Sequence, residues 1–219
     1  MTDIKYPNLN YETNRKIYGD RFVAGADEVG RGAWAGPVSV GIAVLDLDRL
    51  SDAQNLLDSG LNDSKKLSKK KRNELYKAVV EVAADFAVGH ATNKICDDYG
   101  MSAAIGIAAI EAKSKLKVSP EHYLIDGPTN FTNFVSDEIK TCIVKGDSVS
   151  MAIAAASVVA KVTRDAIMDE FHHVYPDYGF SENKGYPSKD HIRALQKFGP
   201  CVLHRTSWKF MEKISHYKC

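Results

Sequence analysis

The chain has 219 residues, of which 44% are hydrophobic and 26% charged. These proportions fit one large folded domain, or one domain with a small appendage, and they exclude the collagen-like, coiled-coil and disordered classes. The formal net charge is +1, so a nucleic-acid partner would have to be held by a local basic patch rather than by overall charge.

The cysteines, the N-terminal residues and the most apolar stretch indicate the cellular compartment in which the protein is expected. Four cysteines are widely spaced, without a C-x-x-C pair or a zinc-finger histidine, so reduced thiols are expected. Residues 1–20 lack the features of a signal or transit peptide. The apolar stretch 151–160 is well short of the ~20 residues that span a bilayer. We expect a cytoplasmic protein without a membrane partner.

The first predicted elements form a β-hairpin. Strand-like segments at 22–29 and 38–45 flank a glycine-rich turn at 30–37. Ser68 is a suitable N-cap for a helix that continues to about residue 82, because apolar residues there recur at helical spacing. A strand at 84–90 is expected to follow.

In the second half of the chain, predicted strands alternate with helices. We expect a helix at 101–116, strands at 122–125 and 141–145, a long helix at 148–172, an irregular segment at 175–187 and a last helix at 189–198. Strands followed by alternating strands and helices indicate an α/β fold with a mixed sheet covered by helices.

Two adjacent carboxylates interrupt the first apolar strand. Burial of Asp27 or Glu28 without a cation or hydrogen bonds would cost several kcal/mol. A salt bridge at the strand end, with the other residue exposed, is the structural alternative. Neighbouring strand residues point to opposite faces, so both side chains reach one metal ion only if the strand bulges or ends there. Otherwise one of the two binds through its backbone.

Two further aspartates are candidates. Asp126 ends a short apolar strand, where ligands of sheet-based folds commonly bind, although an aspartate before Gly-Pro also forms turns. Asp165 lies on the long helix four residues after Lys161 and eight after Ser157, so the three share one stripe. A solvated Lys161–Asp165 pair is the alternative interpretation.

The glycine-rich turn allows two interpretations. Residues 30–35 fit the dinucleotide pattern G-x-G-x-x-A, which keeps a nicotinamide-binding oxidoreductase as an alternative. A dinucleotide site needs the turn to open a helix, however, and here a strand follows. Exposed backbone N–H groups and Arg31 instead suit the close approach of a nucleic-acid strand.

Two other features could contact nucleic acid. The stretch from Lys65 to Arg72 holds six basic residues in eight and is either a solvated face or a phosphate clamp. Tyr186 could stack on a sugar or a base, or could be a packed core tyrosine.

Several segments occur in one characteristic order between about residues 22 and 210. They are AGADEVGRG at 24–32, AGPV at 35–38, LNDSKKLS at 61–68, LIDG at 124–127, AASVVAKVTRD at 155–165, KGYP at 184–187 and HRTSW at 204–208. Together they resemble the type 2 ribonuclease H family, ribonuclease HII. Ala152 and Trp208 depart from the residues usual in that family.

The resemblance implies a ribonuclease H-like α/β fold. A five-stranded mixed sheet would be flanked by helices, with a small helical C-terminal part. Residues 1–219 would form a single catalytic domain, in which about 175–219 are a C-terminal helical appendage.

The resemblance also implies a function. The chain would be a metal-dependent endoribonuclease that cuts on the 5′ side of a ribonucleotide in RNA–DNA hybrids or ribonucleotide-containing DNA duplexes, leaving 3′-hydroxyl and 5′-phosphate ends. It would act as a monomer. A two-metal Mg²⁺ or Mn²⁺ site would use Asp27, Glu28, Asp126 and Asp165, whereas Asp147 is rejected as a ligand. The substrate-binding residues would be Gly30, Arg31, Gly32, Lys65, Ser157, Lys161 and Tyr186. A catalytically silent nucleic-acid-binding module is the alternative.

Overall fold

A five-stranded mixed sheet forms the centre of the molecule. The computed structural model describes residues 6–127 and 133–214, and the strand order is β3-β2-β1-β4-β5. β1 pairs antiparallel with β2 and parallel with β4, while β2–β3 is antiparallel and β4–β5 parallel. The predicted α/β fold with a mixed sheet is confirmed. The strands are β1 (Phe22–Val29), β2 (Val38–Asp46), β3 (Asp85–Ala91), β4 (His122–Asp126) and β5 (Lys140–Ile143).

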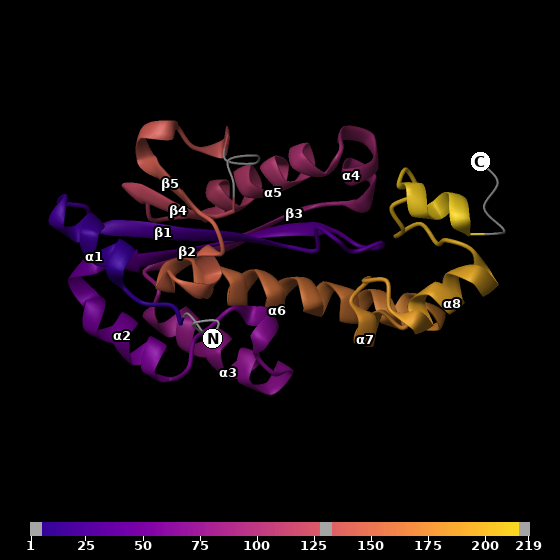
Figure 1. Cartoon of the computed structure of the whole chain (residues 1–219), viewed down its shortest axis with the longest axis horizontal. Coiled ribbons are helices and arrows are strands. Elements are labelled where there is room, and N and C mark those ends of the chain that lie inside the picture. The colour runs from indigo at the N-terminus through magenta and orange to yellow at the C-terminus, as the bar shows by residue number, and fades with distance from the viewer. Residues whose placement is uncertain (1–5, 128–132, 215–219) are drawn as a thin grey trace, which may run out of the picture.

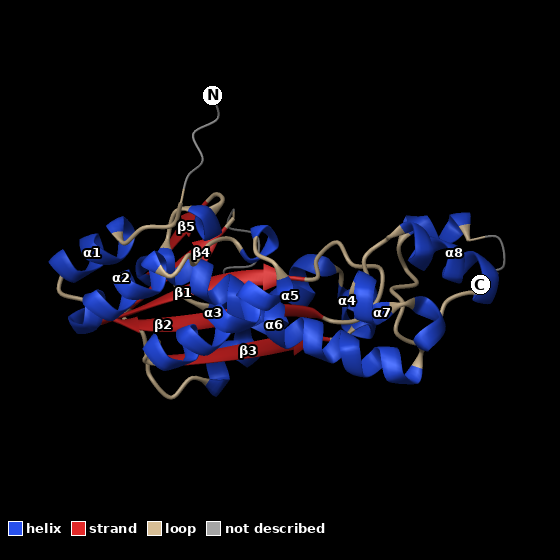
Figure 2. Ribbon diagram, turned by 90° about the horizontal axis from the view of Figure 1, so that it is seen from below, coloured by secondary structure: helices blue, strands red, loops and turns tan. Residues whose placement is uncertain are grey.

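Helices cover both faces of this sheet. Helices α2, α3 and α6 lie on one face, α4 and α5 lie on the other, and α7 and α8 lie beyond one end of the sheet (Figures 1 and 2). The helices are α1 (Asn10–Ile17), α2 (Leu50–Asp58), α3 (Lys69–Val82), α4 (Asn93–Tyr99), α5 (Met101–Lys115), α6 (Met151–Val174), α7 (Phe180–Asn183) and α8 (Lys189–Phe198).

Serine caps fix where three helices begin. The hydroxyls of Ser68, Ser150 and Ser188 accept hydrogen bonds from backbone N–H groups in the first turns of α3, α6 and α8. The long helix begins three residues later than the predicted start at residue 148, because a 3-10 turn over Gly146–Ser148 precedes it. β5 is shorter than the predicted strand and ends at Ile143.

Four of the described helices, α1, α2, α4 and α7, were not predicted. In α1 the one buried residue is Glu12, so no apolar periodicity announces the helix. Helices α2 and α4 are nine and seven residues long, too short for a clear periodic signal. The segment 175–187, predicted to be irregular, contains α7 and a 3-10 turn at Pro176–Tyr178.

The sheet separates two hydrophobic cores. Val23 of β1 packs in the core under α6, whereas its neighbour Ala24 packs in the core under α5. Helix α6 approaches the sheet closely because glycines face it. A Cβ atom added at Gly41 would lie 2.6 Å from the Ala156 carbonyl oxygen, and one at Gly25 would overlap the main chain of Ala152. The helix that carries Asp165 therefore lies flush against the strand that carries Asp27.

Two buried arginines tie the hairpin turn to the C-terminal part. Arg164 and Arg205 are both 0% exposed. The Arg164 guanidinium donates to the carbonyls of Pro37 (2.8 Å), Lys184 (3.0 Å) and Ala35 (3.2 Å). Arg205 donates to the carbonyls of Arg31 (3.0 Å) and Gly36 (3.1 Å). Because the turn, α6 and the segment around Lys184 share these donors, they form one connected unit.

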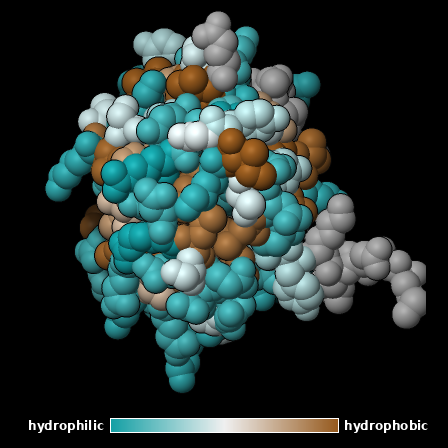
Figure 3. Space-filling model, turned by 90° about the vertical axis from the view of Figure 1, so that its left-hand side faces the viewer, coloured by the Kyte–Doolittle hydropathy of each residue, from teal (hydrophilic) through white to brown (hydrophobic). Residues whose placement is uncertain are grey.

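The C-terminal part has its own hydrophobic cluster. Phe180, Leu195 and Met211 pack there against Met168 of α6. At the opposite end of the molecule, near α1 and α2, the surface is largely hydrophilic with separate hydrophobic patches (Figure 3). Among the described residues, none of the helices combines the length and hydrophobicity that crossing a membrane requires. The described cysteines, Cys96, Cys142 and Cys201, are free.

Candidate active site

Three of the four predicted carboxylates meet where β4 ends. Asp27, Glu28 and Asp126 each place a carboxylate oxygen so that all three atoms lie within 4.8 Å of one another. β4 pairs with β1 only as far as Ile125 opposite Ala26, so Asp126 stands beside the continuing β1 strand. Asp27 and Glu28 leave β1 on opposite faces, and both reach the gap beyond the end of β4. The end of a neighbouring strand, rather than a bulge, brings the side chains together.

The cluster holds negative charge with little compensation. Asp27 is 3% exposed and forms no ion pair within 4 Å in the described part of the chain. Burial, and then the charges of Glu28 and Asp126, raise the pKa of Asp27 well above its usual value. Burial and Asp126 also raise the pKa of Glu28, although Arg31 at 3.8 Å opposes the shift. An all-oxygen cluster of this kind suits a hard divalent cation.

Hydrogen bonds orient two of the three carboxylates, those of Asp27 and Asp126. Asp27 Oδ1 accepts from the Glu28 N–H (2.8 Å), and Asp126 Oδ1 accepts from the Gly146 N–H (2.6 Å). The Ser157 hydroxyl of α6 hydrogen-bonds both Asp27 and, at 2.8 Å, the hydroxyl of Ser64. Ser157 is 1% exposed, so its side chain faces these two partners rather than the open cleft. It orients Asp27.

The fourth predicted carboxylate, Asp165, lies in the same cleft but outside the three-residue cluster. Its carboxylate oxygens lie 2.7 Å from Lys161 Nζ and 3.8 Å from an Arg72 guanidinium nitrogen. The Lys161–Asp165 pair is therefore present, and both side chains are about 15% exposed rather than fully solvated. Asp27, Glu28 and Asp165 all line one cleft of about 600 Å³.

Basic side chains form much of the rest of this cleft. Lys65, Lys69, Arg72, Lys161 and Lys184 line it together with Ser64, Ser181 and Glu182. Burial lowers the pKa of Lys65, but the nearby charges of Asp27 and Asp63 outweigh this effect and leave the pKa raised. Half of the basic stretch predicted from the sequence thus faces the acidic cluster. The cleft therefore combines carboxylates with basic side chains around them.

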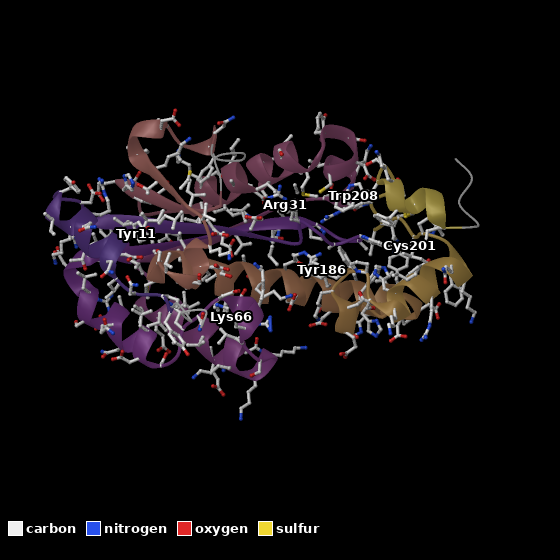
Figure 4. The ribbon with its side chains drawn as sticks, in the orientation of Figure 1. Tyr11, Arg31, Lys66, Tyr186, Cys201 and Trp208 are labelled. Carbon is white, nitrogen blue, oxygen red and sulfur yellow. The ribbon has the colours of Figure 1, made fainter. Side chains whose placement is uncertain are left out.

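Tyr186 connects the far wall of the cleft to the glycine-rich turn. Its hydroxyl accepts from the Gly30 N–H at 3.1 Å, and Lys161 Nζ lies 5.7 Å from the centre of its ring. Gly30 has φ +90°, and a Cβ atom there would overlap the Arg164 side chain. A Cβ atom at Gly32 would meet nothing within 4 Å. Figure 4 shows Arg31 and Tyr186 near the middle of the long axis, with Cys201 farther toward the C-terminal part.

The turn excludes the dinucleotide-binding alternative. Residues 30–37 lead directly into β2, which pairs antiparallel with β1, so no helix N-terminus is available for a pyrophosphate. The strand predicted on both sides of the turn is present as a hairpin.

Sequence reasoning missed several residues at this site. Ser64, Ser181, Glu182 and Lys184 line the cleft but were not singled out. Ser64 follows Asp63 in a segment already recognised as a motif, so its place beside a basic residue was a usable signal. Asp147 lies near the cluster, 3.8 Å from Lys65, and burial together with Asp63 and Asp126 raises its pKa to about 6.

The comparisons with known proteins agree with this geometry. A family model described as Ribonuclease HII matches residues 24–211. Ribonuclease HII of Caulobacter vibrioides is 44% identical over 186 residues, which cover 85% of this chain and 83% of that protein. Ribonuclease HII of Streptomyces coelicolor is 40% identical over 204 residues, which cover 93% and 84%. The crystal structure of ribonuclease H2 from Pyrococcus horikoshii aligns with a TM-score of 0.73 at 27% identity, over 88% of this chain and 96% of that one. The chain therefore belongs to the ribonuclease HII family, whose members are ribonucleases H.

Proposed function

We propose that the protein is a divalent-metal-dependent endonuclease that cuts on the 5′ side of a ribonucleotide. Its substrates are RNA–DNA hybrids and DNA duplexes with embedded ribonucleotides, and its products carry 3′-hydroxyl and 5′-phosphate ends. The observation that carries the proposal is the convergence of Asp27, Glu28 and Asp126 within 4.8 Å, in reach of a cleft with basic walls.

The residues of the cluster fit Mg²⁺ or Mn²⁺. They supply only oxygen ligands, and burial together with the neighbouring carboxylates raises the pKa values of Asp27 and Glu28, a repulsion that a bound cation would relieve. When bound, a pair of such ions neutralises the charge of the phosphodiester and activates water for in-line displacement. Asp27, Glu28 and Asp126 would hold these ions, and Ser157 and the Gly146 N–H keep two of the three carboxylates in place.

Asp165 is the fourth ligand in this proposal. It lines the same cleft as Asp27 and Glu28, and its bond to Lys161 keeps its charge balanced before a cation binds. Asp165 would help to hold a cation, and Lys161 beside it would donate to a substrate phosphate. One face of α6 thus carries Ser157, which orients Asp27, Lys161, which would bind a phosphate, and Asp165, which would bind a cation.

The turn and Tyr186 supply the selection of ribonucleotides. A 2′-hydroxyl is the only chemical mark of a ribonucleotide within a DNA strand. Backbone groups of Gly30 to Gly32 are available to hydrogen-bond it, and the open space beside Gly32 lets a nucleic-acid backbone approach closely. Tyr186, held to the Gly30 N–H, presents its ring beside the same position. Lys65 and Arg31 provide charge for phosphates.

One cleavage assay tests this proposal. An end-labelled DNA duplex with a single ribonucleotide is incubated with Mg²⁺ or Mn²⁺ and with wild type, Asp126→Asn or Asp98→Asn. Asp98 is an exposed aspartate paired with Lys94, so it controls for the loss of one surface charge. We expect wild type and Asp98→Asn to cut immediately 5′ of the ribonucleotide and Asp126→Asn not to cut. Cutting elsewhere would refute the ribonucleotide assignment, and binding without cutting would favour a silent nucleic-acid-binding module.

A further inference from the structure

A buried chain of hydrogen bonds runs behind Tyr186, on the side away from the cleft. His191 Nδ1 lies 2.8 Å from the Tyr186 carbonyl oxygen, and His191 Nε2 lies 3.0 Å from His204 Nε2. His204 Nδ1 in turn lies 3.0 Å from the backbone nitrogen of Cys201. His191 is 0% and His204 1% exposed. Neither imidazole touches the carboxylate cluster, and the site as described makes no use of them.

The Tyr186 carbonyl determines both tautomers when the two rings are neutral. The Tyr186 carbonyl can only accept, so His191 Nδ1 must carry a hydrogen and His191 Nε2 must accept. His204 Nε2 therefore donates, and His204 Nδ1 accepts from the Cys201 N–H. With both rings neutral, every polar atom of the two imidazoles has a partner. An added proton on His191 Nε2 would place two hydrogens face to face between the rings, whereas one on His204 Nδ1 would end the bond from the Cys201 N–H and turn to the Cys201 carbonyl oxygen, 3.2 Å away.

The surroundings of the pair favour these neutral forms. The rings of Tyr178 and Phe180 lie 4.9 and 5.8 Å from the ring of His204, and Phe180 lies 5.5 Å from that of His191. Asp97 of α4 contacts the residues that follow His204, and both oxygens of its carboxylate accept hydrogen bonds from Thr206 and Ser207. Burial lowers the pKa of His204 to about 4, with a further contribution from His191. The network is thus a rigid neutral support.

Tyr186 is therefore hydrogen-bonded through both its side chain and its main chain. Its hydroxyl accepts from Gly30 on the cleft side, and its carbonyl accepts from His191 on the buried side. We infer that His191 and His204 are positioning residues, which fix the main chain of Tyr186 so that its side chain meets the glycine turn at the ribonucleotide. This inference rests on the proposed function, because it assigns Tyr186 to that contact.

The first test measures the position of Tyr186 without substrate. The Gly30 amide donates to the Tyr186 hydroxyl, so its hydrogen exchange, followed by NMR in wild type and His191→Leu, reports that contact. We expect exchange at Gly30 to rise about tenfold, as loss of one buried hydrogen bond would give, while the Gly127 amide, bonded to the Ile143 carbonyl, stays unchanged. Unchanged exchange at Gly30 would overturn the inference.

The second test measures the consequence for catalysis on the single-ribonucleotide duplex. We expect His191→Leu to raise KM about tenfold and to change kcat less than about twofold, because the carboxylates are untouched. His191→Asn, whose amide can donate toward the Tyr186 carbonyl, should recover most of the loss. In a Tyr186→Ala background, His191→Leu should add less than about twofold, since the two residues act through one contact.

A matched control separates positioning from general stability. His122 is also a buried histidine with one side-chain partner, Thr141, but it lies far along β4 from the turn. His122→Leu should lower the melting temperature yet leave KM unchanged. If His191→Leu changed KM by the same factor with Tyr186 present and in the Tyr186→Ala background, His191 and His204 would have only a structural role. Faster Gly30 exchange in a protein that does not cut at ribonucleotides would instead refute the proposed function and keep the positioning role.

Discussion

Two buried charged regions of this molecule are built in opposite ways. At the end of β4, three carboxylates lie within 4.8 Å of one another, and Asp27 forms no ion pair among the described residues. About the hairpin turn, Arg164 and Arg205 are equally buried, but their guanidinium groups donate to five backbone carbonyls. The first region keeps its charges in mutual repulsion, whereas the second gives its charges hydrogen-bond partners.

The difference separates chemistry from support. A buried charge with partners holds segments together, and a buried charge without them lowers stability until a ligand of opposite sign arrives. Substitution in the acidic region should therefore remove activity while sparing or improving the fold. Substitution in the arginine region should damage the fold first.

The largest expected effect is the loss of activity in Asp27→Asn. We expect cleavage to fall at least about a thousandfold, because metal-assisted stabilisation of the transition state contributes several kcal/mol. In the metal-free protein, the same change should raise the free energy of unfolding by about 1 kcal/mol, since it removes one buried charge from the cluster. Urea unfolding with EDTA and with Mg²⁺ measures this, and Mg²⁺ should stabilise wild type but not the variant. A less stable metal-free variant would contradict the contrast.

A second prediction concerns the support region. Arg164→Met should lower the free energy of unfolding by about 3–5 kcal/mol, because three buried carbonyls lose their donor. Arg193→Met is the matched control, since Arg193 is exposed and paired only with Asp190 in the described structure, and it should change stability by less than about 0.5 kcal/mol. Urea denaturation of both variants decides the matter, and a loss below about 1 kcal/mol for Arg164→Met would show that the carbonyls find other partners.

The smallest expected effect is a pH dependence of stability that arises from His204. Its folded pKa of about 4 lies below its unfolded value of about 6.5, so the unfolded chain binds more protons between these values. The contribution of neutral His204 to the free energy of unfolding should therefore be fully present above pH 6.5 and should fall by up to about 3 kcal/mol as the pH drops to about 4. Asp27, with a raised pKa, acts in the opposite direction, so the informative quantity is the difference between wild type and His204→Gln. Parallel curves for the two proteins would refute this assignment.

Patterns with strong local causes were predictable from the sequence. The hairpin of β1 and β2, the cap at Ser68 and the alternation of later strands and helices all follow from periodicity and turn residues. Helix α1 was not predictable in this way, because its buried residue is a glutamate that caps another element. Glu12 accepts from the Ser150 hydroxyl and the Ala152 N–H at the start of α6.

At the site, the sequence predicted which carboxylates matter but not how they are arranged. Nothing local shows that the pairing of β1 with β4 stops at Ala26, one residue before Asp27, which is what lets Asp27 and Glu28 reach the same gap. The burial of Ser157 was equally hidden, because a polar residue on a helix stripe gives no sign that Ser64 will cover it. The histidine chain behind Tyr186 joins residues up to eighteen positions apart, and no spacing rule finds it.

The close packing of α6 on the sheet couples the position of its first turns to that of its later turns. Its first turns rest on Gly25 and Gly41, and its later turns carry Lys161 and Asp165 to the opposite wall of the cleft. A single methyl group at position 25 would push the amino-terminal turns of α6 away from β1 and would move Asp165, on the same helix, with them. The width of the cleft is thus set in part by two glycines close to the carboxylates, since Gly41 lies opposite Asp27 in the β1–β2 pairing and Gly25 precedes Asp27 by two residues.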